Sequence, residues 1–281
     1  MISVLILTLD EELNIADCIG SLPCSRLWRG DIHVLDSCSV DRTVELAEGL
    51  GASVTTRPFT NYADQRNYGL ALPMQHDWIV MLDADERMMP ELAREIEDVI
   101  RHSEIETAMF RVRRRDMFMG RWLRRSSGYP TWFPRVMRRG RVRVNRAVNE
   151  TYLADGQTDE LSEHLIHYPF NKGMSWWFAR NCRYAESEAQ LLIARDARGR
   201  KPWRDLICRD PGLRRAAMKR LAYSLPGRPF LMFLYLYVLR LGFLDGRPGY
   251  HFACMRMAYE IMIDSQAAYE HASRLDQDIA D

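Results

Sequence analysis

The strongest constraint on the fold of this chain is an apolar run that ends in paired carboxylates. Residues 78–82 (Trp-Ile-Val-Met-Leu) are followed at once by Asp-Ala-Asp-Glu at 83–86. Five consecutive apolar residues are typical of a strand buried on both faces, so the carboxylates are expected at its carboxyl end. Open α/β sheets bind ligands at that edge, where two nearby carboxylates can hold a divalent cation. The alternative for this tripeptide is a turn that caps a helix beginning at Pro90.

Strand and helix patterns alternate along the first hundred residues. The residue patterns predict strands at 4–7, 32–35, 53–56 and 78–82, and helices at 12–22, 41–50, 62–72 and 90–101. Strands separated by helices of this length indicate a mostly parallel sheet with helices on both faces. The sequence therefore predicts a Rossmann-like α/β fold.

The chain becomes strongly basic after this region. Between Thr107 and Val148 it contains thirteen arginines and one acid, Asp116. Two short strands are expected, at 109–113 and 133–137, joined by an irregular loop. We interpret this segment as a basic insertion that lies over the mouth of the sheet and meets anions.

The last third of the chain is predicted to be helical, with helices near 175–195 and 212–224. An apolar run at 230–244 carries one charge, Arg240. It is too short to span a bilayer, which takes about 20 apolar residues. It is expected to form a helix lying either at a membrane surface or in a protein core, and the nearby Arg228 and Arg240 favour the membrane.

Six scattered cysteines form no disulfide framework or zinc spacing, and the amino terminus does not resemble a signal peptide. A cytoplasmic location is therefore expected. The chain lacks the glycine-rich signatures of phosphate-binding loops and dinucleotide-binding folds. Polar residues follow three of the expected strands, Thr8 with Glu11, Asp36 with Asp41 and Asp83 with Asp85. Since parallel strands end at the same edge of a sheet, we expect a nucleotide bound there through a metal ion.

Four ordered motifs carry a family resemblance. They are the segments 3–12 and 35–43, the Gln-Arg-Asn element at 65–67 and Asp83-Ala84-Asp85-Glu86. Together they resemble family 2 glycosyltransferases with the GT-A fold, and most closely the branch that adds sugars to the lipopolysaccharide core. The resemblance extends to 135–139, 149–150, His167 and 242–249. It departs at Asp10, Cys38 and Asn149, where the branch usually has Asn, Gly and His.

The resemblance implies two domains and a metal cofactor. Residues 1–170 would form the GT-A domain that binds the nucleotide sugar, and 171–281 a helical extension that contacts the membrane. The cofactor would be Mg²⁺ or Mn²⁺. The donor would be a nucleotide-diphosphate sugar, and the acceptor an anionic glycolipid or saccharide.

The resemblance also implies roles for particular residues. The nucleotide sugar would contact Thr8, Glu11, Asp36, Arg66 and Asp83. The metal would be bound by Asp85, with Asp83 and His167 as further candidate ligands. Glu150 is the candidate catalytic base, with Asp159 and Glu160 as alternatives, and Arg135 and Arg138 are the candidate acceptor-binding residues.

The function expected from these residues is inverting sugar transfer in lipopolysaccharide core or other cell-envelope glycan synthesis, at the inner face of the cell membrane. One alternative keeps the fold but uses a polyprenyl phosphate or protein acceptor. A second alternative is a non-catalytic anion-binding module. Nucleic-acid binding is not expected, because no recognised module accompanies the arginines and aromatic residues.

Overall fold

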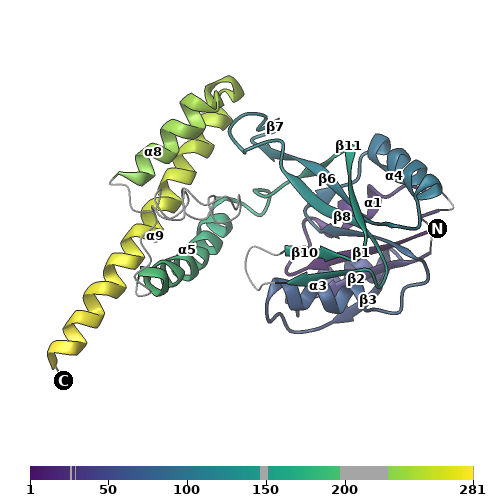
Figure 1. Ribbon diagram of the computed structural model, residues 1–281, viewed down its shortest axis with the longest axis horizontal. Coiled ribbons are helices and arrows are strands. Elements are labelled where there is room, and N and C mark those ends of the chain that lie inside the picture. The colour runs from purple at the N-terminus through teal and green to yellow at the C-terminus, as the bar shows by residue number, and fades with distance from the viewer. Residues whose placement is uncertain (26, 29, 146–150, 197–226, 281) are drawn as a thin grey trace. The chain divides into compact units, whose positions relative to one another are not determined.

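The computed structural model describes residues 1–25, 27–28, 30–145, 151–196 and 227–280 (Figure 1). The chain divides into two compact units. Unit 1 contains residues 1–122 and 129–171, and unit 2 contains residues 123–128 and 172–281. The helix expected at 212–224 lies outside the described residues.

Unit 1 alternates strands and helices before it becomes all-strand. Its helices are α1 (Ile15–Gly20), α2 (Thr43–Gly49), α3 (Tyr62–Leu70) and α4 (Pro90–His102). The strands before residue 90 are β1 (Ile2–Thr8), β2 (Ile32–Asp36), β3 (Ser53–Thr56), β4 (Trp78–Asp83) and β5 (Glu86–Arg87). The later strands are β6 (Thr107–Phe118), β7 (Arg121–Trp122), β8 (Trp132–Arg138), β9 (Val142–Asn145), β10 (Thr151–Ala154) and β11 (Gln157–His167).

The main sheet has the strand order β3-β2-β1-β4-β8-β6-β11-β5. The pairs β3–β2, β2–β1, β1–β4 and β6–β11 are parallel, whereas β8 runs antiparallel to both β4 and β6. Helices cover both faces, so the predicted α/β class is confirmed.

Alternate residues of the central strands supply two separate cores. On β1, Val4 and Ile6 face a cluster that includes residues of α1, α2 and α4. Leu5 faces the opposite cluster, which includes Met81 and residues at the end of α3. Figure 1 shows α3 on the face opposite α1 and α4. Because both faces of β1 and β4 are covered, residues 4–7 and 78–82 are continuously apolar rather than alternating.

The basic segment was expected to lie over the mouth of the sheet, and this expectation was wrong. Strand β8 pairs directly with β4, with Val80 opposite Val136, and β6 pairs with β8. The basic segment therefore extends the sheet itself. Strands β9 and β10 pair antiparallel in a separate two-stranded sheet, and their Val142 and Tyr152 pack on the core cluster that includes Leu5 and Met81.

Unit 2 is helical in its described part. Its elements are α5 (Met174–Asp196), α8 (Arg228–Leu234), the π-helix η1 (Tyr235–Leu239), the 3₁₀-helix η2 (Gly242–Asp245) and α9 (Arg247–Ala280). A continuous helix over 230–244 is thus wrong, because Leu241 adopts a left-handed conformation with φ 58°. Among the described residues, no helix is long and apolar enough to cross a membrane.

The motif at 242–249 has a structural role within unit 2. The buried carboxylate of Asp245 accepts hydrogen bonds from the backbone N–H groups of Arg125 and Ser126, at 2.9 and 2.8 Å, and from the Ser126 hydroxyl at 2.8 Å. A Cβ added at Gly249 would lie 2.1 Å from the carbonyl oxygen of Gly242. The glycines therefore permit close packing of η2 on α9, and Asp245 fastens segment 123–128 to it.

Candidate active site

The carboxyl ends of β1, β2 and β4 bring three polar side chains together, as the sequence predicts. Thr8 lies opposite Asp36 in the β1–β2 register, and Leu7 lies opposite Asp83 in the β1–β4 register. The Thr8 hydroxyl donates to the Asp36 carboxylate at 2.9 Å. Asp36 is fully buried and also accepts from the backbone N–H of Ser39 at 2.8 Å. The edge is therefore a fixed polar surface built on buried strands.

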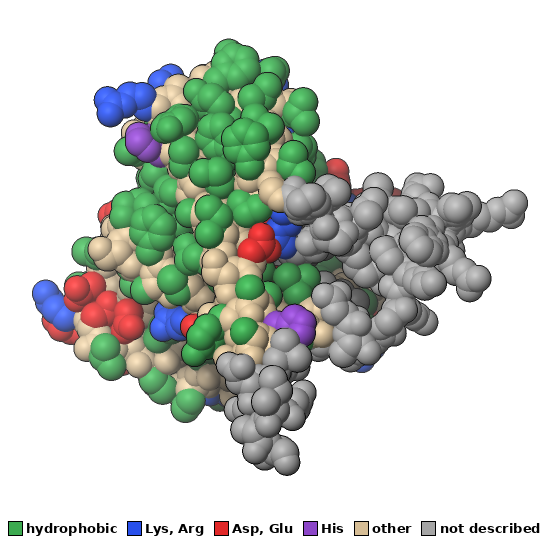
Figure 2. Space-filling view, turned by 90° about the vertical axis from the view of Figure 1, so that its left-hand side faces the viewer, with side chains coloured by type: hydrophobic (Ala, Val, Ile, Leu, Met, Phe, Trp, Pro, Cys, Tyr) green, Lys and Arg blue, Asp and Glu red, His purple; other side chains and the backbone are tan. Residues whose placement is uncertain are grey.

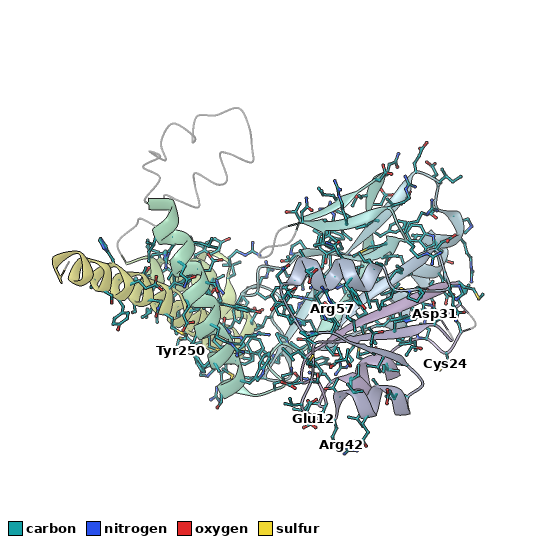
Figure 3. The ribbon with its side chains drawn as sticks, turned by 90° about the horizontal axis from the view of Figure 1, so that it is seen from below. Glu12, Cys24, Asp31, Arg42, Arg57 and Tyr250 are labelled. Carbon is teal, nitrogen blue, oxygen red and sulfur yellow. The ribbon has the colours of Figure 1, made fainter. Side chains whose placement is uncertain are left out.

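Two loops above this edge are tied to each other. The Asp10 N–H donates to the Ser39 hydroxyl, and the Val40 N–H donates to the Asp10 carboxylate. Figure 3 shows Glu12 beside Arg42, whose N–H lies 3.3 Å from the Glu12 carboxylate. Asp10 and Cys38 both have positive φ, at 53° and 65°. Two of the three departures from the family pattern thus keep a left-handed conformation that Asn and Gly adopt easily, and Asn149 lies outside the described residues.

Asp85 faces a histidine that is distant in sequence. Strand β11 pairs with the short β5, which places His167 opposite Glu86, and the Tyr168 N–H donates to the Asp85 carbonyl. The His167 Nε2 atom lies 3.2 Å from the Asp85 carboxylate, and its Nδ1 atom lies 2.7 Å from Asp116. Burial opposes the charged imidazole, but Asp85 and Asp116 outweigh it and raise the pKa of His167 to about 9.

Asp83 is held by two arginines from different elements. The Arg135 guanidinium, 3% exposed, donates to the Asp83 carboxylate at 2.6 Å and to both oxygens of the fully buried Glu86 at 2.7 and 2.8 Å. Arg66 approaches Asp83 at 3.4 Å. Burial alone would raise the pKa of Asp83, but Arg135, Arg66 and Arg114 hold it well below its usual range. Asp83 therefore stays ionised throughout the physiological pH range.

The three residues of the Gln-Arg-Asn element reach three different parts of unit 1. Gln65 donates to the Ser37 hydroxyl at 3.0 Å, and Arg66 is buried beside Asp83. The Asn67 amide exchanges two hydrogen bonds with the backbone of Val144 on β9, at 2.7 and 2.8 Å. Arg66 is thus not a helix-surface arginine, and α3 links the carboxyl ends of β2 and β4 to strand β9.

A cavity of about 700 Å³ opens beside Asp83. The side chains of Trp132, Phe133 and Tyr152 provide aromatic surface. Four arginines also line it, Arg66, Arg111, Arg114 and Arg135, against the single carboxylate of Asp83. The cavity therefore combines flat apolar surface with a positive lining, which suits an anionic ligand that has an apolar face.

The structure does not bring every predicted residue to this site. Arg138 lies at the other end of β4, opposite Trp78, where it packs on the indole ring and donates to the Ile105 carbonyl. Arg135 lines the cavity, but its donors are directed to Asp83, Glu86 and the Pro134 carbonyl. Neither arginine is placed as a free acceptor ligand. Glu150 lies outside the described residues.

The other predicted residues lie within hydrogen-bonded networks. The Glu11 carboxylate accepts from the Asn14 amide at 2.7 Å, and its N–H donates to Thr43. Glu160, an alternative base, forms an ion pair with Arg111 at 2.6 Å.

Sequence reasoning missed the roles of Glu86, Arg114 and Asp116. Arg114 bridges the other two, at 3.6 Å from Glu86 and 3.1 Å from Asp116. The available signal was the isolation of Asp116, the single acid among thirteen arginines. A lone carboxylate in such a segment is more informative than any one of the arginines around it.

The donor set at Asp85 fits a divalent cation in part. The Asp85 carboxylate and the His167 imidazole face each other, and a metal ion bound between them would displace the proton that raises the imidazole's charge, since only the neutral ring ligates a metal. Asp116 holds the other ring nitrogen, as a second carboxylate does in many metal–histidine sites. Among the described residues, no group of three or more His, Cys, Asp or Glu side chains is arranged to hold a metal ion. The protein would therefore supply one carboxylate and one imidazole, and phosphate oxygens of the substrate and water would be the other ligands.

Comparison with known proteins identifies the family. The model of glycosyl transferase family 2 matches residues 3–154, more than half of the chain. This protein belongs to glycosyl transferase family 2.

Two curated relatives are described as uncharacterized glycosyltransferases. The one from Rickettsia felis is 40% identical over 96 residues, covering 34% of this chain and 32% of the relative. The one from Rickettsia typhi is 32% identical over 120 residues, covering 42% of this chain and 40% of the relative. The chain thus spans only about a third of the length of the first curated relatives that it matches.

A solved structure supports the fold over nearly the whole chain. It is a mannosyltransferase from Pyrobaculum calidifontis in complex with GDP-Man and Mn²⁺, 14% identical, with a TM-score of 0.50. The similarity covers 96% of this chain and 87% of that one. The GT-A fold predicted from the sequence is confirmed.

Proposed function

We propose that this protein is an inverting, metal-dependent glycosyltransferase that moves a sugar from a nucleotide-diphosphate sugar to a hydroxyl of an anionic glycolipid or saccharide. The observation that carries the proposal is the juxtaposition of the Asp83–Asp85 edge with the arginine-lined cavity. Family membership and the similarity to a mannosyltransferase bound to GDP-Man and Mn²⁺ support it.

The donor nucleoside is assigned to the edge formed by Thr8, Glu11 and Asp36. Buried carboxylate and hydroxyl oxygens accept hydrogen bonds from a base or a ribose, whereas bare phosphates would be repelled by them. Asp83 is the candidate partner of the ribose, since Arg135 and Arg66 keep it ionised and fixed. The chain's residues thus orient the donor before any chemistry takes place.

Asp85 and His167 are the residues that would hold Mg²⁺ or Mn²⁺. The bound ion would stabilise the negative charge that develops on the departing nucleoside diphosphate. Asp116 contributes by fixing the ring orientation of His167 through the 2.7 Å contact to its Nδ1 atom. Transfer also requires a base that takes the proton of the acceptor hydroxyl as its oxygen bonds to the anomeric carbon. Glu150 remains our candidate for that base.

The acceptor is assigned to the cavity. Arg111 replaces Arg138 as the candidate acceptor ligand, because Arg111 lines the cavity and Arg138 lies at the far end of β4. Trp132 and Phe133 offer flat surfaces on which a sugar ring can pack. A phosphorylated sugar, as in lipopolysaccharide core or another cell-envelope glycan at the inner membrane face, matches this combination. A polyprenyl phosphate acceptor would share the anionic group but not the need for a sugar-sized aromatic surface.

Donor binding to an Asp85→Asn variant tests the metal site. A panel of nucleotide sugars is screened by thermal shift with Mn²⁺ present, and the best donor is titrated by calorimetry. We expect the variant to lose at least about tenfold in Mn²⁺-dependent donor affinity, because one of two protein ligands is removed. Asp98→Asn on α4 is the matched control, since the Asp98 side chain is 69% exposed and forms a loose ion pair with Arg101 at 3.8 Å. Equal donor affinity in the two variants, or no stabilisation of the wild type by any donor, would refute the proposal.

Acceptor recognition is tested with Arg111→Gln and Arg138→Gln. Both replace an arginine on neighbouring strands of the same sheet, but only Arg111 lines the cavity. The first variant should raise the acceptor KM with little change in donor affinity, and the second should change neither. If Arg138→Gln raised the acceptor KM and Arg111→Gln did not, the acceptor site would be assigned to the end of the sheet where Arg138 lies.

A further inference from the structure

Unit 2 displays a cluster of exposed apolar side chains that the glycosyl-transfer site does not use. Six large residues of α8, η1 and η2 form what we call the apolar face. Their exposed fractions are 58% for Phe230, 46% for Tyr235, 47% for Val238, 75% for Leu239, 46% for Phe243 and 57% for Leu244. Figure 2 shows hydrophobic side chains gathered over the upper part of this view. Isolated exposed apolar residues are ordinary, but a contiguous set marks a surface that contacts something.

The backbone beneath the apolar face is firmly built. Arg228, at the start of α8, is buried and pairs with Glu260 at 3.3 Å and Asp264 at 2.6 Å on α9. Ring contacts join Tyr237 to Phe233, Phe243 and Tyr250 with centroid distances of 5.3 to 6.3 Å. Figure 3 shows Tyr250 on α9. The exposed side chains are therefore displayed by a packed support.

The charged residues in the sequence around the apolar face are mostly positive. Between residues 229 and 259 the sequence has a single acid, Asp245, and this residue is buried and hydrogen-bonded to segment 123–128. Arg240 is half-buried and Arg247 is exposed. Arg228, which was expected to favour membrane contact, is buried and paired with Glu260 and Asp264, so it does not add to the positive charge beside the apolar face.

We propose that the apolar face docks unit 2 onto an anionic lipid bilayer, with Phe230, Leu239 and Leu244 entering the acyl boundary and Arg240 and Arg247 meeting the headgroups. Apolar insertion combined with basic residues is the usual pair of signals for stable surface attachment. A second copy of the chain is the less suitable occupant. A twofold contact would place the same face on both subunits and bring their arginines together. The docking extends the proposed function by bringing the enzyme to the surface where a glycolipid acceptor resides.

The test is vesicle co-sedimentation of the full chain without nucleotide sugar or metal, so that its outcome is independent of catalysis. Vesicles of phosphatidylcholine with and without phosphatidylglycerol are compared at low and high salt. The wild type should pellet with the anionic vesicles and be partly released by high salt. Leu239→Asp and Leu244→Asp should each weaken binding at least about tenfold, because an apolar side chain that is buried in lipid is replaced by a charge.

Ile105→Asp is the matched control. It introduces the same charge at an apolar residue of unit 1 that is 82% exposed, and it should pellet like the wild type. Thermal melting shows whether each variant is folded, and Leu239→Ser provides a neutral second variant that should also weaken binding. Failure of the wild type to pellet with anionic vesicles would overturn the proposal. Equal pelleting of Leu239→Asp and wild type would do the same. Concentration-dependent dimers that Leu239→Asp abolishes, without vesicle binding, would assign the face to a second copy instead.

Discussion

Replacement of Arg135 by methionine tests how the candidate site is held together. Arg135 donates two hydrogen bonds to Glu86 and one to Asp83, and Glu86 is completely buried. Removal of one partner from a buried ion pair typically costs about 3–5 kcal/mol, because the other charge is left without compensation. Arg114 lies 3.6 Å from Glu86 and offsets part of this loss. We therefore expect Arg135→Met to lower the free energy of unfolding of unit 1 by about 3 kcal/mol.

A second substitution separates this explanation from a simple packing defect. Glu86→Gln removes the stranded charge but keeps an oxygen for the Asp83 N–H, which lies 3.1 Å from Glu86. The double variant Arg135→Met/Glu86→Gln should recover at least half of the lost stability. Urea denaturation followed by hydrogen–deuterium exchange of the β4 peptide measures the unfolding of unit 1 apart from that of unit 2.

The same ion pair predicts a pH dependence. The pKa of Asp83 lies below its ordinary value of 3.8, so its contribution to stability is fully present above that value and is lost as the pH falls through the folded pKa. Arg135→Met should reduce this acid-dependent loss of stability.

Arg138→Met is the control for Arg135→Met. It makes the same substitution at an arginine that packs on Trp78 and bonds one carbonyl, and it should cost no more than about 1 kcal/mol. The reasoning is refuted if Arg135→Met is as mild as this control, or if the double variant is no more stable than Arg135→Met alone.

Two further predictions concern other parts of the chain. Asp245→Asn should destabilise unit 2 by about 2 kcal/mol, since a buried carboxylate that accepts three hydrogen bonds loses its charge and one acceptor oxygen. Glu270→Gln is the control, and an unchanged melting temperature of Asp245→Asn would contradict the expected role. Burial raises the pKa of the Cys18 thiol, so Cys18 should resist alkylation in the native protein while the exposed Cys24 and Cys38 react. Mass spectrometry of the labelled peptides measures the three rates. Labelling of Cys18 as fast as Cys38 would show that α1 opens readily.

The sequence alone determined the first hundred residues well, because local physics decides them. The run at 78–82 is apolar at every position, which indicates a strand whose two faces are both covered by helices. Parallel strands then place Thr8, Asp36 and Asp83 at the same edge of the sheet. Motif order then indicated the family, which the match over residues 3–154 confirms. These inferences depend on periodicity and chain direction, which are visible in the sequence.

Only the tertiary structure decided which residues meet across long stretches of chain. The pairing of β11 with β5 and β6 brings His167 between Asp85 and Asp116, and β8 pairs with β4 so that Arg135 reaches Asp83 while Arg138 lies at the opposite end. The apolar run at 230–244 likewise shows no sign in its composition of the break at Leu241. Strand partners and register arise from cooperative packing of distant segments, and composition does not encode them locally. The carboxylates behind the 78–82 strand were therefore predictable, but their partners were not.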